Sequence, residues 1–162
     1  PYTTLFRSTR EAVNETLNDL LKINNDRIAG YETAITEASG LDIDLKSVFE
    51  GMIQQSMQHK EELASMIAKN GGTVEDETTP AGKIYRAWMD IKASITERNR
   101  LSILASCEFG EDAAQRAYES ALSPSIILDA DTRKMVESQQ YALQKSHEMI
   151  KKQHDAYKAL QK

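Results

Sequence analysis

Residues 71–99, GGTVEDETTPAGKIYRAWMDIKASITERN, decide the fold because they separate two pairs of long helical segments. The stretch opens with a Gly-Gly pair and an acidic polar run, which indicate the end of a helix followed by a solvated loop. Thr79 and Pro80 then restart the chain as a short helix over residues 82–95. A connection of this length can cross a whole helical bundle, whereas antiparallel neighbours need only a few residues.

Two long helices are predicted before this connection from apolar residues at helical spacing. The first covers about residues 11–39 and ends at Gly40. The second begins after an N-cap at Asp42 or Asp44 and continues to about Asn70. Because the link between them is short, we expect them to be antiparallel neighbours.

Two more helices are predicted after the connection. The third ends at about Leu122, and the fourth, capped by Asp129 or Asp131, continues to about Leu160. They are also joined by a short turn. The sequence therefore predicts an all-α protein: a ferritin-like antiparallel four-helix bundle with a long crossover that contains a short extra helix.

The bulk composition excludes several classes of protein. The 162 residues carry a formal net charge of −5 without a Lys/Arg block, so we expect no nucleic-acid partner. No run of about 18 apolar residues occurs, so we expect no membrane span. The single cysteine, Cys107, precludes an internal disulfide and is typical of a reducing compartment, so we expect a cytoplasmic protein.

Residues 1–8, PYTTLFRS, lack the helical periodicity of the rest of the chain. Their reverse translation, CCC TAC ACG ACG CTC TTC CGA TCT, resembles the end of a common short-read sequencing adapter. We therefore expect residues 1–8 to be an assembly artefact of metagenomic data, and residues 9–162 to form a single four-helix-bundle domain. The alternative is a genuine disordered tail.

Each predicted helix places polar residues on its inner face, where an unpaired carboxylate is costly. These residues are Asn24 and Glu32, then Gln55 and His59, then Glu108 and Glu111, and finally Gln140, Gln144 and His147. Glu62 could pair with His59 on the inner face or could face solvent beside Glu61. Because the crossover spans the bundle, the carboxylates of Glu32, Glu108 and Glu111 fall at a similar height. The sequence therefore predicts a polar layer inside the core, to which Tyr31 and Tyr118 could donate hydrogen bonds.

A metal ion is one explanation of this layer. Glu108 and Glu111 lie one helical turn apart, and two close carboxylates repel unless a proton or a cation lies between them. One Fe, Mn or Zn ion held by Glu32, Glu108, Glu111, His147 and His59 would satisfy the grouping. The alternative is a metal-free, hydrogen-bonded layer that fixes the helix register.

Three stretches, LNDLLKINNDRIAGYETAI, GKIYRAWMDIKASIT and ASCEFGEDAAQRAYESAL, together resemble a bacterial ferritin-like family of unknown function. The resemblance spans about residues 15–158, and it implies a four-helix bundle of the rubrerythrin/ferritin-like superfamily without an established activity. That superfamily binds two metals with a Glu from each of two helices and Glu-x-x-His from the other two. The resemblance therefore implies Glu32 and Glu108 as the single carboxylates, with Glu111 completing a Glu-x-x-Glu pair of the rubrerythrin type.

The remaining two helices depart from the superfamily pattern. The fourth reads Gln144-x-x-His147 and the second reads Ser56-x-x-His59, so both lack the carboxylate. Three carboxylates would neutralise two irons poorly, and this departure favours one metal ion or none.

Two functions follow from these observations. The first is a stress-related protein that stores, buffers or redox-cycles one metal ion. The second is a non-catalytic structural or interaction bundle, in a homo-oligomer for example. The sequence leaves enzymatic activity open and favours a structural or binding role over an enzyme; an enzyme of this kind would be a metal-dependent oxidoreductase. No small-molecule substrate can be inferred from the sequence.

Overall fold

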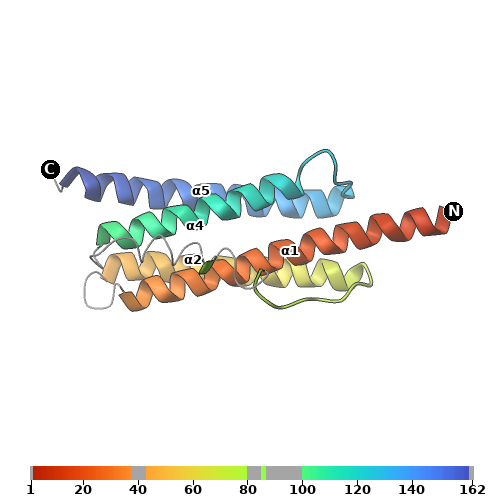
Figure 1. The fold of residues 1–162 in the computed structure, drawn as a ribbon, viewed down its shortest axis with the longest axis horizontal. Coiled ribbons are helices and arrows are strands. Elements are labelled where there is room, and N and C mark those ends of the chain that lie inside the picture. Colours follow the sequence, from red (N-terminus) through yellow and green to blue (C-terminus); the bar gives the residue numbers. More distant parts are fainter. Residues whose placement is uncertain (1, 38–42, 80–84, 87–99, 161–162) are drawn as a thin grey trace.

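The computed structural model describes residues 2–37, 43–79, 85–86 and 100–160. These residues form four long helices, α1 (Tyr2–Glu37), α2 (Ile43–Lys69), α4 (Arg100–Ala121) and α5 (Ala130–Leu160). Figure 1 shows α1 beside α2 and α4 beside α5, with the two hairpins packed into an elongated bundle. No strand occurs among the described residues, so the predicted all-α bundle is confirmed.

The direction of each helix follows from hydrogen bonds across the bundle. Asn24 of α1 contacts Tyr118 of α4, and Arg27, further along α1, contacts Glu111, which is earlier in α4. Helices α1 and α4 are therefore antiparallel. Since α1 and α2 are also antiparallel, α4 runs parallel to α2, and the chain must return along the bundle between them (Figure 1). This is the predicted crossover.

The start of the crossover, residues 73–79, is hydrogen-bonded to one face of α1. Asn18 donates to the carbonyl of Thr73 and accepts from the backbone N–H of Glu75, at 2.9 and 2.8 Å. One turn further on, Lys22 pairs with Glu75 at 3.1 Å. The acidic loop is exposed, as expected. Polar side chains of α1 also hold it against the helix.

These contacts continue to the end of the described loop. Asn25 donates to Asp76 Oδ1 and to the carbonyl of Glu77, at 2.8 and 2.7 Å. The buried Asp26 carboxylate then accepts a hydrogen bond from Thr79. Of the short helix predicted over residues 82–95, the structure describes Tyr85 and Arg86, and both are helical.

Two adjacent glycines end α2. The N–H groups of Gly71 and Gly72 donate to the carbonyls of Ala68 and Ile67, each at 2.9 Å, which is the paired bonding of a Schellman cap. Gly71 adopts a φ of 76°, a backbone conformation that residues other than glycine rarely adopt. A Cβ on Gly72 would overlap the Asn14 amide group, so a larger residue there would have to displace the Asn14 side chain.

Asp129 caps the start of α5. Its carboxylate accepts hydrogen bonds from the hydroxyl and the backbone N–H of Thr132, at 2.6 and 3.3 Å. The hydroxyl bond is the main reason that the pKa of Asp129 lies below its ordinary value. The structure thus selects Asp129 over Asp131 as the N-cap.

Helix α1 begins at Tyr2 and not near Glu11. No glycine or proline follows Pro1 in this region, and extending an existing helix costs little compared with starting one. The artefactual origin of residues 1–8 stays a prediction. The expected helix ends at Gly40 and Asp42 lie outside the described residues.

Within the part of the chain that the structure describes, the apolar core is divided into two clusters. One contains Leu17, Leu21, Leu63, Tyr118 and Leu143 with their neighbours. The other has Tyr31, Phe49, Leu104 and Ile150 among its large members, and it also contains the fully buried Cys107. Polar residues of all four helices fill the space between the two clusters, and they include the candidate site.

Candidate functional site: a buried polar layer

A buried ion pair lies at the centre of the layer. Arg27 of α1 and Glu111 of α4 are 2% and 0% exposed, and Arg27 Nε donates to Glu111 Oε1 at 2.7 Å. Burial by itself lowers the pKa of Arg27, but the neighbouring Glu111 charge and the hydrogen bond raise it, with a net upward shift. The guanidinium is therefore a permanent cation inside the bundle.

Hydrogen bonds extend this pair to a third helix. Arg27 Nη1 donates to Ser56 Oγ at 2.7 Å and to the carbonyl of Met52 at 3.2 Å, both on α2. The Tyr31 hydroxyl donates to the same Glu111 oxygen at 2.6 Å. Burial and the Glu111 charge hold the pKa of Tyr31 well above its ordinary value, so Tyr31 remains a donor. The predicted contribution of this tyrosine to the polar layer is confirmed.

A second network lies next to this pair and joins all four helices. The Tyr118 hydroxyl accepts from Asn24 at 2.9 Å and donates to Gln139 Oε1 at 2.6 Å. The Gln139 amide donates to the His59 carbonyl and to Glu62 Oε1, each at 3.2 Å. Each helix thus contributes at least one group, which links the two hairpins through their interior.

His59 is buried beside this network as a neutral imidazole. Burial, followed by the positive charge of Arg27, lowers the pKa of His59 to about 4. Its Nδ1 atom has no hydrogen-bond partner among the described residues. The predicted interior position of His59 is correct, but the described residues around the ring leave one of its nitrogen atoms without a hydrogen bond.

The other predicted ligands lie at the seam between α4 and α5. Glu108 Oε2 is 2.6 Å from His154 Nδ1, and Asp112 Oδ1 is 2.6 Å from His147 Nε2. The first contact has hydrogen-bond geometry, and the second is an ion-pair distance without the alignment of a hydrogen bond. Glu108 therefore meets a histidine and does not share a centre with Glu111, so the expected convergence of these two carboxylates is wrong.

Glu32 points away from the core. It is exposed, whereas its neighbour Tyr31 is fully buried. Successive helical residues are rotated by about 100°, so Tyr31 and Glu32 cannot both face the interior. The expected inward position of Glu32 is wrong, and so is that of Gln144, which is also exposed; of the two positions left open for Glu62, the structure shows the exposed one.

The described residues do not fit a two-metal centre of the ferritin-like type. Within them, no group of three or more His, Cys, Asp or Glu side chains could hold a metal ion. The guanidinium of Arg27 lies against Glu111, the most buried of the predicted ligands. A model of the family described as "Domain of unknown function (DUF2383)" matches residues 12–124.

The chain belongs to the DUF2383 family.

A fold comparison agrees with the topology of this DUF2383 chain. The solved structure of a Mycobacterium smegmatis Dps1 mutant is similar to it with a TM-score of 0.78 and 17% sequence identity. The match covers 91% of this chain and 97% of that chain, and at this identity it shows the ferritin-like fold alone. No curated protein matches the chain significantly. Among the described residues, no helix has both the length and the apolar character of a membrane span.

Arg27 and Gln139 are the main residues of the DUF2383 site that the sequence reasoning missed. Arg27 lies between Asn24 and Tyr31 at spacings of three and four residues, which places all three on one helical face. That spacing is the one sequence signal that points to Arg27. It is weak, because a long charged side chain on a helix is usually solvated, and the spacing does not distinguish a buried arginine from a solvated one.

Proposed function

We propose that this DUF2383 protein is a non-catalytic ferritin-like bundle that serves as a structural or interaction module, with a polar layer held by its own side chains. The observation that supports this proposal most directly is the contact between Arg27 and Glu111. A buried carboxylate requires a compensating positive charge. Here the chain supplies that charge itself, with hydrogen bonds from Tyr31 to Glu111 and from Arg27 to Ser56 around it.

The guanidinium also disfavours a second cation at the same place. Two unit charges about 4 Å apart interact by about 4 kcal/mol at an effective dielectric constant of about 20. A divalent ion beside Arg27 would experience a larger repulsion. Metal binding at Glu111 would therefore require Arg27 to move out of a site in which it bonds to two other helices.

The layer has a structural role that needs no metal. Helices that slip by one turn would leave Arg27 and Glu111 buried without each other, and a broken buried ion pair costs about 3–5 kcal/mol. The Asn24–Tyr118–Gln139 network adds the same constraint between all four helices. Purely apolar clusters tolerate such slips better, so the polar layer fixes the register of the bundle.

One metal ion per chain is the competing function. It is favoured by two buried atoms, Glu111 Oε2 and His59 Nδ1, which have no hydrogen-bond partner among the described residues. A buried water molecule can satisfy such atoms as well as a metal can. The two explanations differ in what the purified protein retains.

Metal analysis of protein purified without chelator tests the proposal. Fe, Mn and Zn would be quantified before and after incubation with each ion, followed by buffer exchange. We expect substoichiometric metal in the wild type, in Glu111→Gln and in the matched control Glu32→Gln, whose side chain is exposed. Stoichiometric metal that is lost in Glu111→Gln but retained in Glu32→Gln would refute the proposal and establish the competing function.

A further inference from the structure

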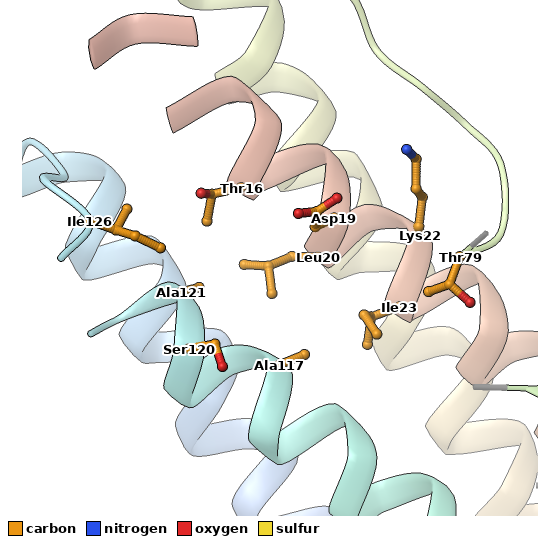
Figure 2. Close-up of a pocket in the computed structure, with 10 residues that line it drawn as sticks. All are labelled: Thr16, Asp19, Leu20, Lys22, Ile23, Thr79, Ala117, Ser120, Ala121 and Ile126. Carbon is orange, nitrogen blue, oxygen red and sulfur yellow. The ribbon is translucent and has the colours of Figure 1, made fainter. Parts of the chain in front are cut away.

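An apolar groove lies between α1 and α4 near the α4–α5 turn. It has a volume of about 430 Å³. Figure 2 shows Leu20 and Ile23 of α1 on one side and Ala117 and Ala121 of α4 on the other, with Ile126 at one end. The two alanines are too small to fill the space between the helices. An apolar side chain from outside could therefore enter the groove.

The charges at the α1 side of the groove are mainly negative. Asp19 lines the groove, and its pKa is raised by partial burial and by the charges of Glu15 and Glu75, while Lys22 lowers it. Lys22 itself pairs with Glu75 at 3.1 Å. The carboxylates of Glu75, Glu77 and Asp19 all act on this one ammonium group, so this edge of the groove favours a positively charged partner.

The far end of α5 has the complementary character. Met149 and Leu160 are 48% and 78% exposed, and the exposed Ala156 lies between them. The spacings of seven and four residues place these three side chains on one helical face. The exposed Lys152 lies beside this apolar stripe, as does Lys145, which pairs with Glu148 at 3.8 Å.

The two surfaces of one chain cannot meet. The groove lies near the turn before α5, whereas Leu160 is the last residue of that helix. Figure 1 shows the α4–α5 turn and the C-terminal end of α5 at opposite ends of the bundle. Tyr118 of α4, beside the groove, bonds to Gln139 of α5, and the helix rises about 1.5 Å per residue from Gln139 to Leu160, so roughly 30 Å separate the groove from Leu160. Contact between the two surfaces therefore requires two molecules.

We propose that the groove between α1 and α4 binds the end of α5, residues 149–160, of a second copy of this chain. The apolar stripe of Met149, Ala156 and Leu160 packs along the groove, and Lys152 lies beside Asp19. Such contacts are heterologous because each copy uses a different surface, so they generate a closed ring or an open filament. This inference rests on the proposed role as an interaction module and names its partner.

Sedimentation and light scattering of the full chain over a range of concentrations test this arrangement. We expect oligomers that grow with concentration and weaken as salt screens the charged edge of the groove. Ser120→Lys adds a positive charge to the lining of the groove, and Leu160→Asp disrupts the apolar stripe. Each variant alone should associate at least about tenfold more weakly than the wild type, whereas the exposed control Met57→Asp, on α2 and away from both surfaces, should not.

A mixture of the two variants gives the decisive result. The Ser120→Lys chain retains an intact α5 end, and the Leu160→Asp chain retains an intact groove. Head-to-tail binding therefore predicts that equal amounts form a 1:1 dimer that does not grow further, while circular dichroism verifies that both variants fold. A monomeric wild type, or variants that leave association unchanged, would overturn the inference. Neither result would alter the metal analysis, so a failure here is distinguishable from a failure of the proposed function.

Discussion

Replacing Arg27 with Met removes the cation of the polar layer and retains most of the side-chain volume. In Arg27→Met, Glu111 keeps the hydrogen bond from Tyr31 but loses its ion pair, and both ion-pair partners are almost completely buried in the wild type. An uncompensated buried charge costs about 3–5 kcal/mol. For a chain of this size that corresponds to a fall in the unfolding midpoint of roughly 6–20 °C.

The double variant Arg27→Met/Glu111→Gln separates the ion pair from simple loss of packing. The neutral amide that replaces the Glu111 carboxylate can still accept the Tyr31 hydroxyl, and no charge is then left without its partner. The cost of the double variant should be about 2–3 kcal/mol smaller than the sum of the two single costs. Urea unfolding followed by circular dichroism at pH 7 gives all four free energies.

Two results would refute this reasoning. Strictly additive single costs would mean that Arg27 and Glu111 do not interact in solution. A single variant Arg27→Met as stable as the wild type would mean that another cation or a proton compensates Glu111. In that second case, metal analysis of the variant would show which of the two is present.

Three further predictions concern the helix ends and the interior histidine. Gly71→Ala should destabilise the fold by about 1 kcal/mol because alanine disfavours the φ of 76° at the end of α2, and equal stability of variant and wild type in urea would contradict the cap. Asp129→Ala should cost about 0.5–2 kcal/mol at pH 7. Because the folded pKa of Asp129 is depressed, this difference should be present above pH 3.8 and disappear as the pH falls through the folded pKa; a difference independent of pH would exclude the cap. His59 has a folded pKa of about 4 and an ordinary value of 6.5, so the unfolded chain binds the proton more readily and the wild type should lose up to about 3 kcal/mol between pH 6.5 and pH 4. His59→Gln should flatten this part of the stability profile, while the same profile in wild type and variant would show that His59 is not protonated on unfolding.

The fold was predictable because its signals are local. Gly71 and Asp129 end and begin helices through their own backbone and side-chain chemistry, without reference to the rest of the molecule. The crossover followed from chain length alone, since a connection as long as residues 71–99 is unnecessary between neighbouring helices. The early start of α1 was missed because a weakly periodic segment can extend a helix that tertiary contacts stabilise elsewhere.

Only the position of the polar layer along the bundle axis was predictable from the sequence. The expected polar layer exists, and Glu111, His59 and Tyr31 are buried in it or beside it. The direction of each side chain around its helix was not predictable to the same degree, because an error of one residue rotates a position by about 100°. Such an error placed Glu32 on the inner face of α1, whereas the structure buries its neighbour Tyr31 and leaves Glu32 exposed.

The sequence also did not show which group each buried carboxylate contacts. Nothing local distinguishes a carboxylate that binds a metal from one that binds an arginine on another helix. Arg27 and Glu111 are separated by 84 positions, and their contact exists only once α1 and α4 have packed. The same is true of Glu108 and His154, which belong to different helices of the second hairpin.

The division of the apolar core into two clusters has a consequence for how this protein can change. Among the described residues, the cluster around Leu63 and the cluster around Phe49 are separate, so replacements at one end should have energetic effects independent of those at the other. Each end of the molecule is thus free to acquire new surface properties separately. Only substitutions in the central band of polar groups must be matched across all four helices at once.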